Sequence, residues 1–128
     1  MNSQIERFLQ EVADLPGFHG ISIADLNTHS DFGDTPLHVA AIRGDAAMIE
    51  ALLNAGAQID AAGEHQYTPL HEAVEQGHIE AVQLLLSRGA SLTAQTDDGA
   101  TPVELARLMG RRDIEILLRD REHEHKFG

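Results

Sequence analysis

Eight histidines and 21 acidic side chains are the residues of this 128-residue chain with the greatest capacity for chemistry. His71-Glu72 begins like the metal-binding helix of a zinc protease, but Glu75 stands where that pattern needs its second histidine. His123 and His125 could form a weak chelating pair, yet both lie in a charged tail that we expect to be solvated and partly disordered. The sequence therefore predicts no metal site and no cofactor.

Catalytic patterns are also missing. The chain has no cysteine, which excludes a thiol nucleophile, a disulfide and a cysteine zinc site. Its serines lack a glycine-framed elbow, and no glycine-rich phosphate loop occurs. The carboxylate pairs Asp97-Asp98 and Glu72/Glu75 would need a cleft to shift their pKa values. We predict no catalytic residue and no enzyme; stoichiometric metal in the purified protein would revive a hydrolase or metalloenzyme.

A fixed period organises the elements that carry these side chains. Thr-Pro pairs begin at Thr35, Thr68 and Thr101, each 33 residues after the last, and such a period is typical of stacked repeats. Each threonine can cap a helix whose first turn holds the proline. A glycine follows nine residues after each threonine and favours the left-handed conformation that ends the helix. A second apolar stripe then predicts a second helix in each unit: Ile49, Leu52, Leu53; Val82, Leu85, Leu86; and, one residue early, Ile114, Leu117, Leu118.

His38 and His71 occupy equivalent places after the first two Thr-Pro pairs, and Glu104 replaces histidine in the third. A neutral imidazole has one donor and one acceptor, which suits bracing of a loop backbone. We therefore expect both rings to hydrogen-bond the loops rather than to act as ligands or bases.

The N-terminal segment departs from the repeat. Ile5, Phe8, Leu9 and Val12 recur at helical spacing and predict one amphipathic helix that covers the first open face of the stack. We divide the chain into a capping helix and loop (1–22), a repeat domain (23–122) and a charged tail (123–128). The repeat domain comprises a degenerate repeat tail (23–29) and units at about 30–62, 63–95 and 96–121.

The Thr-Pro-Leu-His-x-Ala signature, the period, the glycines and the Leu-Leu…Gly-Ala runs resemble ankyrin repeats. The resemblance is strong over 30–118, weaker over 23–29 and absent over 1–22. It implies an all-α repeat solenoid of stacked helix-turn-helix units with β-turn fingers around 31–34, 63–67 and 96–100. The second finger has Gln66 where the other two have Gly33 and Gly99.

The resemblance also implies a protein-binding scaffold that uses its finger tips and the exposed side of its first helices. Carried onto this sequence, the predicted partner-binding residues are Asp31, Phe32, Asp34, Ile42, Arg43, Glu64, His65, Tyr67, Glu75, Gln76, Asp97, Asp98, Leu108 and Met109. Aromatic and apolar anchors among polar groups are typical of the centre of an interface.

The net charge of -12 is unevenly placed. Residues 110–128 hold five acids and five bases, whereas residues 1–109 hold 16 acids and four bases. Such a body repels nucleic acid and attracts a basic protein. The alternative reading is that the acidity only keeps the protein soluble.

We expect a cytoplasmic protein with no membrane partner, because neither a secretory signal nor a membrane-length apolar run is visible. We also expect it to be monomeric alone. The leading hypothesis is a non-enzymatic module whose acidic concave face binds a basic protein, in a specific version as an inhibitor or immunity-type protein. A cytoplasmic scaffold or regulatory accessory protein is the alternative. Self-association is a further one, through an apolar edge at Phe18, Ile21 and Ile23.

Overall fold

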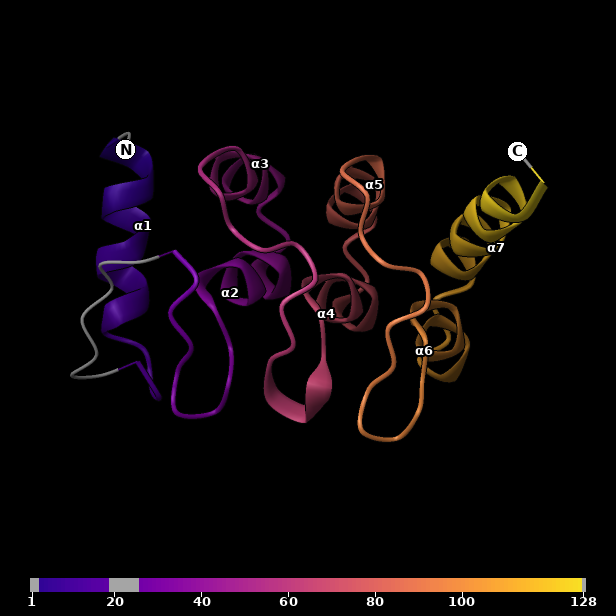
Figure 1. Ribbon diagram of the computed structural model, residues 1–128, viewed down its shortest axis with the longest axis horizontal. Coiled ribbons are helices and arrows are strands. Elements are labelled where there is room, and N and C mark those ends of the chain that lie inside the picture. The colour runs from indigo at the N-terminus through magenta and orange to yellow at the C-terminus, as the bar shows by residue number, and fades with distance from the viewer. Residues whose placement is uncertain (1–2, 19–25, 128) are drawn as a thin grey trace.

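The computed structural model describes residues 3–18 and 26–127, and within them seven α-helices stack into a solenoid (Figure 1). The elements are α1 (Ser3–Ala13), α2 (Pro36–Arg43), α3 (Ala46–Asn54), the short 3-10 turn η1 (Glu64–Gln66), α4 (Pro69–Gln76), α5 (Ile79–Ser87), α6 (Pro102–Leu108) and α7 (Arg112–Phe127). The helix pairs α2–α3, α4–α5 and α6–α7 form the first, middle and last units. The predicted all-α repeat solenoid is confirmed.

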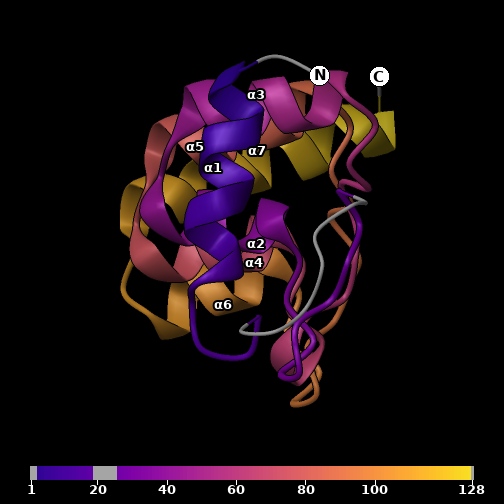
Figure 2. The same ribbon diagram turned by 90° about the vertical axis from the view of Figure 1, so that its left-hand side faces the viewer.

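The helices form two rows. Figure 1 shows the first helices α2, α4 and α6 side by side in one row and the second helices α3, α5 and α7 in the other. The fingers that precede α2, α4 and α6 project on the same side, as the view along the stack shows (Figure 2). We call the surface made by these fingers and first helices the inner face.

The start of each unit is fixed by its own sequence. The side chains of Thr35 and Thr68 accept hydrogen bonds from the backbone N–H groups of His38 and His71, and a proline occupies the first turn. The threonine N–H groups in turn donate to Nδ1 of these rings, at 3.0 and 3.1 Å. This reciprocal capping satisfies amides that a helix start would otherwise leave without partners.

The two histidines also join neighbouring units. Because Nδ1 of each ring accepts a hydrogen bond from threonine, Nε2 carries the proton. Nε2 of His38 donates to the Tyr67 carbonyl at 2.8 Å, and Nε2 of His71 donates to the Ala100 carbonyl at 3.0 Å. Burial is the main cause that lowers the pKa of both rings and keeps them neutral. The predicted bracing role is confirmed.

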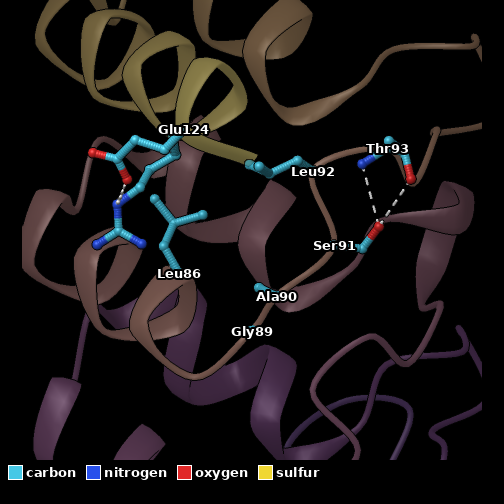
Figure 3. Close-up of a pocket in the computed structure, with 8 residues that line it drawn as sticks. Leu86, Gly89, Ala90, Ser91, Leu92, Thr93 and Glu124 are labelled. Atoms are coloured by element: carbon cyan, nitrogen blue, oxygen red, sulfur yellow. Dashed lines mark hydrogen bonds and ion pairs between the residues drawn. The ribbon is translucent and has the colours of Figure 1, made fainter. Parts of the chain in front are cut away.

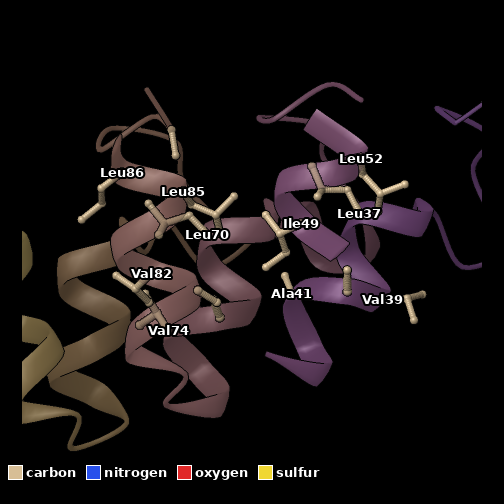
Figure 4. Close-up of a cluster of buried hydrophobic side chains, with 14 of the residues drawn as sticks. Leu37, Val39, Ala41, Ile49, Leu52, Leu70, Val74, Val82, Leu85 and Leu86 are labelled. Carbon is tan, nitrogen blue, oxygen red and sulfur yellow. The ribbon is translucent and has the colours of Figure 1, made fainter. Parts of the chain in front are cut away.

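The core lies between the two rows. Its largest fully buried apolar side chains include Leu37, Ile49, Leu52, Leu70 and Leu85 (Figure 4). Fully buried alanines at Ala40, Ala73 and Ala106 recur at the 33-residue period, where a larger side chain would force the first helices apart.

α1 covers the outer side of the first unit. Its apolar stripe is buried against α2 and α3, and Arg43 of α2 pairs with Glu11 of α1 at 3.3 Å. Phe18 is only 3% exposed, so its predicted part in a sticky edge is wrong: the segment after α1 folds it into the core. Ile21 and Ile23 lie outside the described residues.

The last unit differs from the others in its second helix. α7 spans 16 residues, against nine in α3 and in α5, and Figure 1 shows it inclined to them. The expectation of a partly disordered end is wrong for residues 123–127, which continue α7. No glycine or proline interrupts this stretch, and Arg119–Glu115 and Arg121–Glu124 pair along the helix at 2.9 and 3.9 Å.

Candidate functional site

An acidic groove lies on the inner face between the first and middle units. It encloses about 320 Å³ and is lined by residues from both fingers and both first helices: Asp34, Ile42, Glu64, His65, Tyr67, Glu72 and Glu75. Four of the seven are carboxylates, and no lysine or arginine is among these lining residues. We use the name acidic groove for this set.

The middle finger shapes one wall of the acidic groove. His65 and Gln66 both have positive φ values, 57° and 62°, and are the non-glycine residues of the described chain that do so. A left-handed conformation costs a non-glycine residue about 1 kcal/mol. Two bonds offset this cost: Gly63 N–H donates to the Tyr67 carbonyl at 2.7 Å, and Glu64 N–H donates to Asp34 Oδ1 at 3.0 Å.

The middle finger is also joined to the last one. The Asp97 N–H donates to the His65 carbonyl at 2.9 Å. The His65 ring lies between two carboxylates, with Nε2 3.8 Å from Glu64 and Nδ1 3.7 Å from Asp97. The Asp97 carboxylate on the third finger therefore lies next to His65, at the edge of the acidic groove.

Glu72 is the unusual residue of the acidic groove. It stands 33 residues after Val39 and 33 before Leu105, which are only 8% and 5% exposed. A carboxyl thus occupies a position that is apolar in both neighbouring units. Burial, followed by the charges of Asp34, Glu75 and Glu64, raises the pKa of Glu72 to about 8.

Tyr67 packs at the edge of the same cluster. Its ring contacts the His71 ring, with centroids 5.5 Å apart. Burial, the charge of Glu75 and a hydrogen bond to that carboxylate raise the pKa of Tyr67 to about 12. The phenol therefore remains a donor at physiological pH and fixes the Glu75 side chain.

The structure brings together six of the fourteen predicted partner-binding residues in the acidic groove: Asp34, Ile42, Glu64, His65, Tyr67 and Glu75. Asp97 and Asp98 lie on the next finger, where Asp98 adds to the field at Tyr67. The sequence suggested Glu72 only as half of a carboxylate pair and as part of an incomplete zinc-protease pattern. The signal that could have identified it is the 33-residue register with Val39 and Leu105.

The remaining predicted residues lie outside the acidic groove. Asp31 and Phe32 are exposed on the first finger, and Gln76, Leu108 and Met109 are exposed near the ends of α4 and α6. Arg43 is held by Glu11 and lies over the Phe8 ring, 5.7 Å from its centroid. Arg43 therefore stabilises the contact between α1 and α2.

A larger hollow of about 490 Å³ lies between the end of α5, the loop after it and α7 (Figure 3). Leu86, Ala90 and Leu92 contribute to its lining. Its polar groups are already paired: Ser91 Oγ accepts from the Thr93 N–H at 3.2 Å, and Arg121 faces Glu124. This hollow offers packing surface but no group prepared for chemistry.

Within the described residues, no group of three or more His, Asp or Glu side chains is placed to hold a metal ion. No helix in that part of the chain combines the length and the apolar character that crossing a membrane requires.

The chain matches a known family of proteins. A family model described as ankyrin repeats, in three copies, matches residues 5–96. The match begins within α1 and stops at the start of the last finger, although α6 and α7 form the same kind of helix pair. No curated protein matches the chain.

Proposed function

Because this chain belongs to the ankyrin repeat family, whose members are in general protein-protein interaction modules, we propose that it binds a basic group of a protein partner in the acidic groove. The family supports binding of a protein, and the groove supports the choice of a basic one.

The carboxyl of Glu72 is the observation that carries the proposal. Its pKa is raised to about 8 because it is partly buried beside other carboxylates, so the groove disfavours its ionised form when no cation is present. A lysine or arginine side chain placed among these oxygens would lower the pKa of Glu72 and stabilise its ionised form. The acidic groove is therefore prepared for a cation from outside the chain.

The proposal includes a role as inhibitor or immunity-type protein, since an acidic surface can occupy a basic active site. A scaffold would leave the partner's activity unchanged. Assay of the bound partner, with and without this protein, distinguishes the two: complete loss of activity at equimolar ratio identifies an inhibitor.

A peptide titration tests the groove directly. The probe is a fluorescent arginine-glycine peptide, compared with its citrulline isostere, which has the same shape without charge. We expect binding of the arginine peptide alone, weakening between about 50 and about 300 mM salt because the contact is electrostatic. The double substitution Glu72→Gln and Glu75→Gln should weaken binding about 10-fold, since charged hydrogen bonds are lost.

The matched control is Glu50→Gln with Glu80→Gln, which removes two exposed charges from α3 and α5. This control should bind nearly as well as the unchanged protein. Equal weakening in both double variants would mean that net charge alone attracts the peptide, and the groove would then have no special role.

A further inference from the structure

The inner face carries two rows of equivalent side chains that run across α2, α4 and α6. One row consists of Val39, Glu72 and Leu105, and the other of Ile42, Glu75 and Leu108; in each row, neighbours are 33 residues apart. In both rows the middle unit alone has a carboxylate, and the units on either side have an apolar residue. The acidic stripe of α4 therefore has apolar neighbours along the stack.

Leu108 is the apolar neighbour that is free to meet a partner. It is 72% exposed, the highest value among the exposed large hydrophobic residues of the described chain, and Met109 beside it is 42% exposed. A single exposed leucine is common on protein surfaces. Here, however, it stands in the same row as Glu75, on the helix next to α4.

The spacing of the helices sets the spacing of the ligand. Packed helices lie roughly 8–10 Å apart, which is the separation expected between the Glu75 and Leu108 positions. An extended polyproline-type segment rises about 3.1 Å per residue with three residues per turn, so side chains three residues apart lie on one side, about 9 Å from each other. A chain crossing α4 and α6 can thus present one side chain to each helix.

We propose that the inner face binds an extended partner segment in which a basic residue and a large apolar residue stand three positions apart. The basic side chain lies on Glu72 and Glu75, and the apolar side chain lies on Leu108 and Met109. This inference rests on the proposed function and adds the sequence pattern that the partner must carry. Charge complementarity places the cation on α4, and the exposed leucine places the apolar group on α6.

A double-mutant cycle in solution tests the pattern. The probes are short capped peptides of glycine and serine that carry one arginine and one leucine. The leucine stands two or three positions from the arginine, on either side of it. In the control peptides, serine replaces the leucine. Binding is followed by NMR titration of the labelled protein. We expect the three-position peptide to bind about 10-fold more tightly than its serine counterpart, as burial of a leucine side chain predicts.

Leu108→Ser should remove this gain for the three-position peptide and leave the serine peptide unaffected. Ile116→Ser is the matched control, because Ile116 is also exposed, at 53%, but belongs to α7 in the other row. It should leave the gain unchanged. Thermal unfolding of both variants confirms that each remains folded.

The outcomes separate this inference from the proposed function. If arginine peptides bind with one affinity wherever the leucine stands, the spacing is overturned and the acidic groove still binds cations. If the leucine matters but Leu108→Ser does not change its effect, the apolar contact lies elsewhere and the inference is equally overturned. If no arginine peptide binds, both proposals fall.

Discussion

The first and middle units share their architecture and differ in what they present on the inner face. Both begin with Thr-Pro-Leu-His, both use the histidine to cap their own first helix, and both extend it to the next finger. Yet the residue after that histidine is Val39 in one unit and Glu72 in the other, and three positions later Ile42 corresponds to Glu75. The histidine holds the units together, whereas Ile42, Glu72 and Glu75 line the acidic groove, so recognition can change while the fold stays the same.

The last unit differs from the other two in the residue that caps its first helix. Glu104 replaces the histidine, and its Oε1 accepts from the Thr101 N–H at 3.1 Å and from the Thr101 hydroxyl at 2.9 Å. The local cap is thus preserved by a different side chain. Within the described residues no finger follows α7, so Glu104 makes no bond there like the one from His38 or His71 to the next finger.

The largest effect is expected from removing the histidine of the middle unit. His71→Ala loses the bond to Thr68 and the bond to Ala100, and leaves a cavity in a fully buried site. We expect a loss of about 3 kcal/mol in the free energy of unfolding, measured by urea denaturation. Glu104→Ala should cost clearly less, since it removes only a local cap.

Equal losses for the two variants would show that the link between units adds nothing to the cap. Acid titration gives a second measure. Because burial lowers the pKa of His71 in the folded protein, this ring contributes stability that is present above about pH 6.5, the value of a free imidazole, and is lost as the pH falls. The unfolding free energy of His71→Ala should therefore fall less steeply on acidification.

A smaller effect of opposite sign is expected at the residue that distinguishes the middle unit. Glu72→Leu restores the apolar character of Val39 and Leu105, and should raise the free energy of unfolding at pH 8 by about 1 kcal/mol. The pKa of Glu72 is higher in the folded protein than in the unfolded chain. Its protonation therefore contributes stability that is fully present below about pH 4.5 and is lost as the pH rises through about 8. The loss of stability over this range should flatten in Glu72→Leu.

Glu72→Gln serves as the control for charge, because it keeps the shape of the side chain and cannot ionise. It should flatten the pH dependence as Glu72→Leu does. An unchanged slope in both variants would mean that another group of the acidic groove binds the proton.

The smallest effect is expected at Gln66 in the middle finger. Gln66 in the middle finger has φ 62°, while the equivalent Gly99 in the last finger has φ 82°. Gln66→Gly should stabilise the protein by about 0.5 kcal/mol, because relief of backbone strain exceeds the added entropy of the unfolded chain. Gly99→Ala should destabilise it by about 1 kcal/mol, because alanine must adopt the left-handed conformation there. Thermal unfolding measures both, and a destabilised Gln66→Gly would show that the glutamine side chain supports the middle finger.

The sequence by itself determined the units, because their signals are local or periodic. A threonine caps the helix that follows it, a glycine ends that helix, and the 33-residue period repeats these signals. The same reasoning predicted that α1 covers the stack and that His38 and His71 brace the loops. The helical end of α7 was not predicted, since a charged stretch of good helix formers is equally typical of a solvated tail.

Only the tertiary structure decided the acidic groove. Its lining comes from four segments, represented by Asp34, Ile42, Glu64 to Tyr67, and Glu72 with Glu75, which become neighbours only when two units stack. The raised pKa of Glu72 has the same origin, because burial and the charges of Asp34 and Glu64 act through space across those segments. Residue types and a period specify each unit, whereas the electrostatic environment of a side chain depends on every segment that packs against it.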